Sequence, residues 1–157
     1  MPYALQPMLR IRTRREDRAA TELTAARTAE REAERALEAR KEELADYERT
    51  KEERRDRVYE TVMGRPVSRE AIDLVQEGVA KIDREGAERA DAVVRADEER
   101  KRKEEAVVVA QGALNLATKN RMKIEEHRDA WILEDRKDQE HHEEFELEDF
   151  TGRKQDD

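Results

Sequence analysis

Histidine and carboxylate side chains toward the end of the chain are the residues whose types and spacing could bind a metal ion. The three histidines are His127, His141 and His142, and Asp138 lies one helical turn before His142. Neighbouring residues on an α-helix point about 100° apart, so His141 and His142 cannot share one metal ion as residues four apart do. The chain also has no cysteine and no glycine-rich phosphate loop. We therefore expect no metal site, no cofactor and no catalytic group, and the protein is predicted not to be an enzyme.

Arginine side chains are concentrated near the N-terminus, at Arg10, Arg12, Arg14 and Arg15. The apolar residues between them, Leu9 and Ile11, are expected to lie off the helix–helix interface and to be exposed. Guanidinium groups at this density are typical of a surface that docks an acidic partner. A frayed helix end with ordinary solvated arginines accounts for the pattern equally well, so both interpretations stay open.

Large apolar side chains are concentrated near the other end of the chain. Trp131 is the single tryptophan, and both phenylalanines follow it, at Phe145 and Phe150, with Leu147 between them. Trp131 is expected to close the end of a helix pair against three apolar residues of the N-terminus: Tyr3, Leu5 and Met8. Phe145, Leu147 and Phe150 are left without a partner in this scheme, and we expect them to meet another protein.

The distribution of glycine and proline predicts the elements that carry these residues. Residues 8–62 contain neither, and residues 69–150 contain no proline, whereas Gly64 and Pro66 interrupt the chain between them. Ser68 is a suitable N-cap for a second helix. We predict an all-α fold, a single antiparallel coiled-coil hairpin over residues 1–157, in which the second helix is longer. Its parts are a helix over about 7–62, a turn over 63–68, a helix over about 69–150, and a flexible tail over 151–157.

Apolar and small residues recur at steps of three and four in both segments, which is the spacing of a coiled coil. In the first segment the predicted seam follows Met8, Arg12, Arg15, Ala19, Leu23, Ala26, Glu30, Ala33, Leu37, Arg40, Leu44, Tyr47, Lys51, Arg54 and Val58. In the second it includes Val75, Val79, Ile82, Gly86, Leu114, Ile124, Arg128 and Trp131. Counting outward from the turn places Leu37 opposite Val94 and Val58 opposite Asp73.

Composition excludes several classes of protein. Charged residues make up 47% of the chain and aromatic residues only 4%, which is too little apolar surface for a compact core and typical of a long helix or coiled coil. The net charge of −8 argues against nucleic-acid binding. No run approaches the roughly 20 apolar residues that span a bilayer, and the N-terminus does not resemble a signal peptide. A cytoplasmic location without direct membrane insertion is therefore expected.

The chain resembles the YscO/FliJ family, the small coiled-coil hairpins of bacterial type III secretion in injectisomes and flagella. The likeness is carried by the opening at residues 5–16, the turn in the middle of the chain, and the ending from residue 119 through Trp131 to Phe150. The acidic ending at residues 144–150 favours the injectisome (SctO-type) proteins over the flagellar ones. The resemblance implies a monomeric central stalk that inserts into and activates the hexameric export ATPase, contacts the export gate, and escorts secretion chaperones.

The resemblance also implies positions for these contacts. The ATPase would be met by Arg10, Arg12, Arg14, Arg15, Arg128 and Trp131. The cytoplasmic domain of the export gate would be met by Leu74, Val75, Gly78 and Val79. The protein would lie in the cytoplasm, peripheral to the inner-membrane secretion apparatus.

A second hypothesis comes from the weak, alanine-rich seam. Long seams of this kind often gain stability by oligomerisation. The chain would then be a structural coiled-coil adaptor whose helices pair with other chains rather than with each other.

Overall fold

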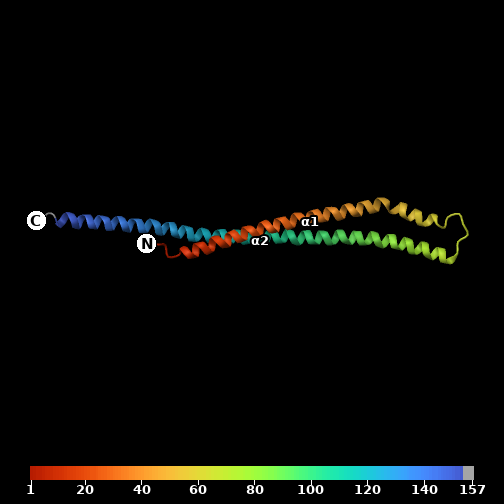
Figure 1. Ribbon diagram of the computed structural model, residues 1–157, viewed down its shortest axis with the longest axis horizontal. Coiled ribbons are helices and arrows are strands. Elements are labelled where there is room, and N and C mark those ends of the chain that lie inside the picture. Colours follow the sequence, from red (N-terminus) through yellow and green to blue (C-terminus); the bar gives the residue numbers. More distant parts are fainter. Residues whose placement is uncertain (154–157) are drawn as a thin grey trace. The chain divides into compact units, whose positions relative to one another are not determined.

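Two long α-helices account for nearly all of the chain in a computed structural model that describes residues 1–153 (Figure 1). Helix α1 spans Gln6–Glu60 and α2 spans Arg69–Arg153, and residues 61–68 join them. The described residues form no strand. The predicted all-α hairpin with a longer second helix is confirmed, and the two helices pair with each other in one chain. Helix α2 continues through residues 151–153, which were expected in the tail, while residues 154–157 lie outside the described part.

The turn between the helices is built by the residues that predicted it. Gly64 has a φ of 72°, a left-handed conformation in which an L side chain is strained. Ser68 caps α2, because its side-chain oxygen accepts a hydrogen bond from the amide of Ala71 at 3.2 Å. Glu70 adds a carboxylate in the first turn, near the positive end of the helix dipole. The predicted N-cap is therefore confirmed.

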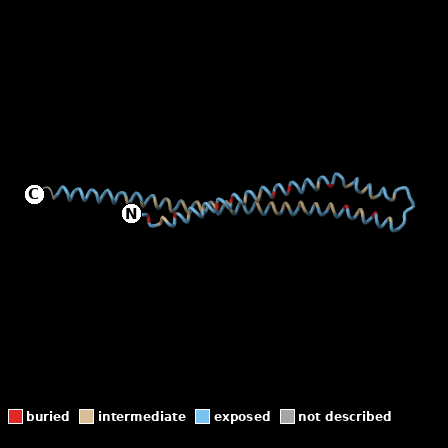
Figure 2. Tube along the Cα trace, in the orientation of Figure 1, coloured by how far each residue is buried: buried red, intermediate tan, exposed pale blue. Residues whose placement is uncertain are grey.

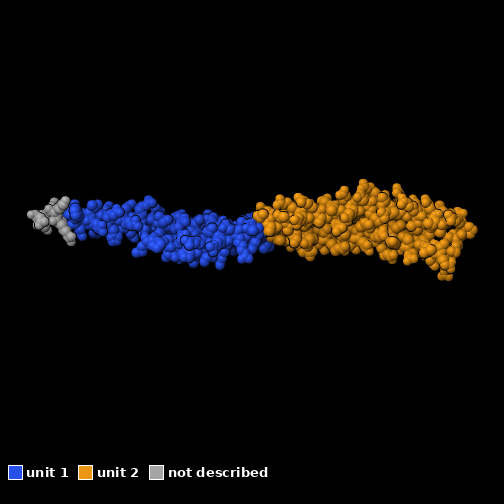
Figure 3. Space-filling model, in the orientation of Figure 1, with its two compact units in different colours: residues 1–23, 109–157 blue, residues 24–108 orange. Residues whose placement is uncertain are grey.

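Contacts divide the chain into two compact units (Figure 3). The first contains residues 1–23 with the described residues from Val109 onward, and the second contains residues 24–108. Each unit is a pair of antiparallel helical segments, one from α1 and one from α2, and the second unit includes the turn. No helix in the described part of the chain is long and apolar enough to cross a membrane.

The core consists of a few buried positions spaced along the two helices, drawn in red in Figure 2. Its buried members are Tyr3, Leu9, Ala19, Leu23, Ala33, Leu37, Tyr47, Val75 and Ile82. Most of these positions belong to the predicted seam, which is confirmed through the middle of α1 and for Val75 and Ile82 on α2. Because several seam residues are alanine, the helices approach closely but bury little apolar area.

The seam near the start of α1 lies one residue later than predicted. Leu9 is only 5% exposed, although we expected it on the surface, and Met8 is 41% exposed although we expected it in the seam. Ile11 is exposed, as expected. The expected seam took two consecutive steps of four, from Arg15 to Ala19 to Leu23. A coiled coil maintains alternating steps of three and four, and this alternation leads back from Leu23 to Leu9.

The predicted pairing of residues across the hairpin is wrong for Val58 and for Val94. Val94 is 57% exposed rather than packed on Leu37. Val58 lies against Gly78, where an added Cβ would come within 3.2 Å of Val58 Cγ1, rather than against Asp73. Side chains on a helix tilt toward its N-terminus, so in an antiparallel pair they tilt in opposite directions. Contact partners are therefore displaced from those found by counting Cα positions alone.

Tyr47 is the most buried core residue of the second unit, at 3% exposure. Its ring lies against Gly86, where an added Cβ would come within 3.3 Å of Tyr47 Cε1, so the absence of a side chain makes room for the ring. The hydroxyl donates to the carbonyl of Ile82 at 2.7 Å and lies 3.3 Å from Glu85 Oε2. Burial, and then the carboxylate of Glu85, raise the pKa of Tyr47. The phenol therefore stays protonated and fixes the register of the two helices.

Two guanidinium groups lie over the Tyr47 ring. The Cζ atoms of Arg54 and Arg89 are 4.9 Å and 4.2 Å from the ring centroid. Both distances are within the range of cation–π attraction. One arginine comes from each helix, so these contacts also connect the helices around the tyrosine.

We expect Tyr47→Ala to destabilise the protein by about 3 kcal/mol, because a buried aromatic side chain is lost opposite a glycine that cannot fill the space. Tyr47→Phe should cost about 1 kcal/mol, since only the hydroxyl contacts are removed. Urea unfolding followed by circular dichroism measures both values. The control is Tyr59→Ala, at a tyrosine that is 45% exposed, which should change stability by less than about 0.5 kcal/mol. Equal losses at both tyrosines would contradict the assigned role of Tyr47.

Candidate protein-binding site

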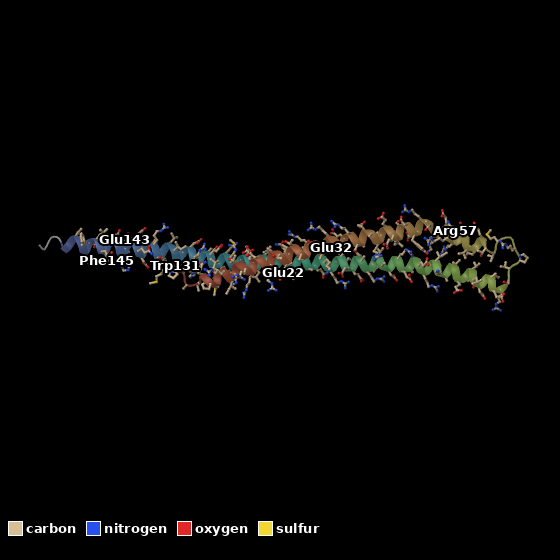
Figure 4. The ribbon with its side chains drawn as sticks, viewed as in Figure 1. Glu22, Glu32, Arg57, Trp131, Glu143 and Phe145 are labelled. Carbon is tan, nitrogen blue, oxygen red and sulfur yellow. The ribbon has the colours of Figure 1, made fainter. Side chains whose placement is uncertain are left out.

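The N-terminal residues of the first unit close over α2 through one tyrosine. Tyr3 is 8% exposed, and its ring centroid lies 5.5 Å from that of Trp131 in a tilted arrangement. Its hydroxyl is 2.8 Å from Nδ1 of His127, a hydrogen bond whose direction depends on the histidine tautomer. The expected contact of Trp131 with Tyr3 is confirmed, and Figure 4 shows Trp131 beside the start of α1. The hydrogen bond to His127 was not foreseen.

An ion-pair network connects the two helices next to this contact. The guanidinium group of Arg121 on α2 donates to Glu16 of α1 and to Glu125 one turn further along α2. All three side chains are partly buried. The hydrogen bonds to Glu16 and then Glu125 raise the pKa of Arg121. This network holds α1 in position immediately beside the arginine-rich segment.

Three arginines from both helices line an open groove in the first unit. Arg10 and Arg14 lie one turn apart on α1, and Arg128 faces them from α2. The remaining lining residues are Gln6, Leu9, Thr13 and Glu125. Arg128 also donates to Asp129 at 3.2 Å. The structure therefore brings together three of the six residues expected at the ATPase interface, and we call this site the arginine groove.

The other three expected residues lie outside this groove. Arg12 is half-buried on the seam, and Arg15 is exposed. Trp131 is half-buried and lies beside the ring of Tyr3. An ATPase surface that included all six residues would therefore extend around the helix pair rather than lie on one face.

The arginines at the start of α1 are held in an electrostatically unfavourable arrangement. The first turn of α1, residues 6–9, contains no acidic residue, and the arginines begin in the second turn. Arg10, Arg14 and Arg18 are spaced four apart, and like charges at this spacing cost about 0.2–0.5 kcal/mol per pair. Among the described residues Arg18 pairs with Glu22, whereas Arg10, Arg12, Arg14 and Arg15 form no ion pair. Such an arrangement fits a surface that awaits an anionic partner.

The residues expected at the export gate lie in the second unit, and most of them belong to the helix interface. Val75 is buried, Gly78 packs on Val58, and Val79 is half-buried. Leu74 is 68% exposed. It borders an apolar hollow with Arg57, Val58, Thr61, Val75 and Gly78. Of the four expected residues, Leu74 is therefore the one that offers its side chain to a partner.

The last part of α2 carries the expected binding tail. Phe145, Leu147 and Phe150 are each more than 60% exposed, and Figure 4 shows Phe145 and Glu143 on this stretch of helix. The ring centroid of Phe145 lies 6.3 Å from that of His141.

No group of three or more metal-ligating side chains occurs among residues 1–153.

One exposed apolar surface was missed by the sequence analysis. Val109 and Leu116 on α2 are 73% and 61% exposed, and between them nothing lies within 4 Å of a Cβ built at Gly112. The sequence does contain a signal for this surface, because residues 106–118 have no charged side chain in a chain that is 47% charged.

Substitution of Tyr3 tests the closure of the first unit. Tyr3→Ala should shift Trp131 fluorescence to longer wavelength and increase its quenching by acrylamide, because the ring that covers the indole is removed. The lost aromatic contact should cost about 0.5–1.5 kcal/mol beyond the area that it buries. Tyr59→Ala, in the other unit, should leave the emission unchanged. An unchanged spectrum in Tyr3→Ala would show that Tyr3 does not cover Trp131 in solution.

Comparison with known proteins gives one match. The family model described as Type III secretion protein YscO matches residues 5–153, which is nearly the whole chain. No curated protein and no solved structure matches. The family match agrees with the resemblance carried by the arginine-rich opening and the central turn. The chain therefore belongs to the YscO family of type III secretion proteins.

Proposed function

We propose that this protein is the non-enzymatic central stalk of a type III secretion system, which inserts into the hexameric export ATPase and activates it. The observation that carries the proposal is the group of four arginines near the start of α1, which form no ion pair within the described part of the chain and include like charges four residues apart. A cost in stability of this kind is retained where the charges serve binding. Membership of a type III secretion family supplies the biological setting.

The helix pair suits entry into a protein ring. An antiparallel pair of α-helices is about 20 Å across, from two helix diameters of about 10 Å each. Charged faces bind reversibly, since ion pairs at the rim of an interface set association rate and register more than affinity. We place the ATPase contact at the arginine groove and the neighbouring Trp131.

The stalk role also includes contacts with the other expected partners. We propose that Leu74, beside the turn, contacts the cytoplasmic domain of the export gate, and that secretion chaperones are escorted by the same protein. The protein would act in the cytoplasm, at the periphery of the inner-membrane secretion apparatus. The injectisome remains the preferred system because of the acidic ending of the chain.

Reversal of two groove charges tests the ATPase contact. Arg10→Glu/Arg14→Glu should raise the concentration needed for half-maximal stimulation of the export ATPase by about tenfold or more, which corresponds to about 1.4 kcal/mol. ATP hydrolysis by the ATPase of the same system, titrated with each variant, is the measurement. Arg31→Glu/Arg35→Glu is the matched control, because it places the same charge change at the same spacing on an exposed part of α1 in the second unit.

The control variant should stimulate as the wild type does. Equal loss in both variants would indicate a dependence on net charge rather than on the arginine groove. Absence of both binding and stimulation by the wild-type protein would contradict the proposed function itself.

Leu74→Asp tests the export-gate contact. We expect binding to the cytoplasmic domain of the gate to weaken by about tenfold, because an exposed apolar anchor is replaced by a charge. Isothermal titration calorimetry measures the affinity. Val94→Asp is the control, since Val94 is a comparably exposed aliphatic residue on α2. If both variants bind equally well, the gate contact lies elsewhere.

A further inference from the structure

The last part of α2 is a helix whose side chains are exposed. Every residue from Arg136 to Gly152 is exposed, and the segment is helical throughout (Figure 2). Most of the stability of helices in proteins comes from packing of one face rather than from propensity. A partner that covers this segment would stabilise it.

The charge of this segment restricts the partner. Residues 134–149 carry nine Asp and Glu side chains against two basic ones, Arg136 and Lys137. Phe145 and Leu147 add exposed apolar area, at 64% and 65% exposure. The segment therefore fits a surface that is basic and has some apolar character.

The first unit of the same molecule contains such a surface. The arginine groove has Arg10 and Arg14 without ion pairs among the described residues, and Arg128 opposite them. Leu9 lines the groove, and Met8 and Ile11 nearby are 41% and 50% exposed. Acidic helix and basic groove are complementary in charge, and each also offers apolar side chains.

The acidic segment cannot reach the groove of its own chain. Arg128 lies on α2, which continues as one uninterrupted helix to Arg153 and so leads the segment away from the groove. A second copy of the chain has no such restriction. At a rise of about 1.5 Å per residue, residues 134–150 span about 25 Å, more than the distance covered by Arg10 to Arg14.

We propose that two copies of this protein associate through these ends, with the acidic segment of each copy lying in the arginine groove of the other. The two contacts are equivalent, so the dimer has two-fold symmetry and closes without leaving a free acidic segment or a free groove. Because the contacts are largely exposed ion pairs, association is weak and sensitive to salt.

Self-association of this kind has a regulatory consequence. Arg10, Arg14 and Arg128 would be covered in the dimer, so a protein that binds the arginine groove would compete with the second copy. The competition with the export ATPase rests on the proposed function, whereas the dimer itself does not.

Charge exchange between two variants tests the dimer. The tail variant is Glu143→Lys/Glu144→Lys/Glu146→Lys, and the groove variant is Arg10→Glu/Arg14→Glu. Each variant alone should be monomeric at concentrations where the wild type dimerises, a weakening of about tenfold or more, because both contacts now join like charges. An equimolar mixture should form a heterodimer, since both contacts again join opposite charges. Sedimentation equilibrium at about 20 mM and about 500 mM salt measures the masses, and the wild-type dimer should dissociate at the higher salt.

The control variant is Glu42→Lys/Glu48→Lys/Glu53→Lys, which makes the same charge change at exposed positions of the second unit. It should dimerise as the wild type does, and circular dichroism should show equal helix content in all variants. A wild-type protein that stays monomeric at low salt, a dimer that persists in both variants, or a mixture that does not associate would each overturn the proposal. Because the readout is mass without any ATPase present, these outcomes are independent of the proposed function.

Discussion

The structure depends on one geometric constraint, the alternation of three- and four-residue steps that keeps a single narrow stripe of each helix facing the other. Many positions of that stripe are alanine or charged, so the helices gain little from burial. The fit of individual large side chains therefore contributes more to stability and register than it would in a thick core. In the second unit Tyr47 fits against Gly86 and donates to Ile82, and this contact distinguishes one register from its neighbours.

A thin core leaves nearly all of the chain as charged surface, and the two units use that surface differently. In the second unit many charges are satisfied within a helix, as in the pair of Arg40 with Glu43 and the contacts of Arg100 with Asp97 and Glu104. In the first unit the arginines at the start of α1 are not satisfied in this way. The contrast is not apparent from total charge, because the net charge of the chain is acidic while this surface is basic.

Local signals in the sequence were sufficient for the two helices and the turn between them. Glycine and proline at 64 and 66, with Ser68 as the cap, placed the turn correctly because backbone preferences act within a few residues. The seam was correct at the apolar positions from Ala19 to Tyr47, where the heptad phase was followed. It failed at Leu9 because a step of four was repeated from Arg15 to Ala19 to Leu23. The pairing count failed at Val58 and Val94 because it ignored the tilt of side chains. Val75 and Val79 were assigned to a partner surface by resemblance, although their place in the predicted seam already indicated burial.

The sequence by itself determined that the chain would form two helices, where they would turn, and which stripe of each would be covered. These properties follow from propensity, capping and periodicity, all of which act over short stretches of chain. The tertiary structure decided which distant residues meet. Tyr3 bonds to His127 across 124 positions, Arg121 reaches Glu16, and Arg128 joins Arg10 and Arg14 around one groove. Such long-range contacts depend on the axial offset between the two helices. This offset is fixed by the packing of the whole seam and not by any local group of residues.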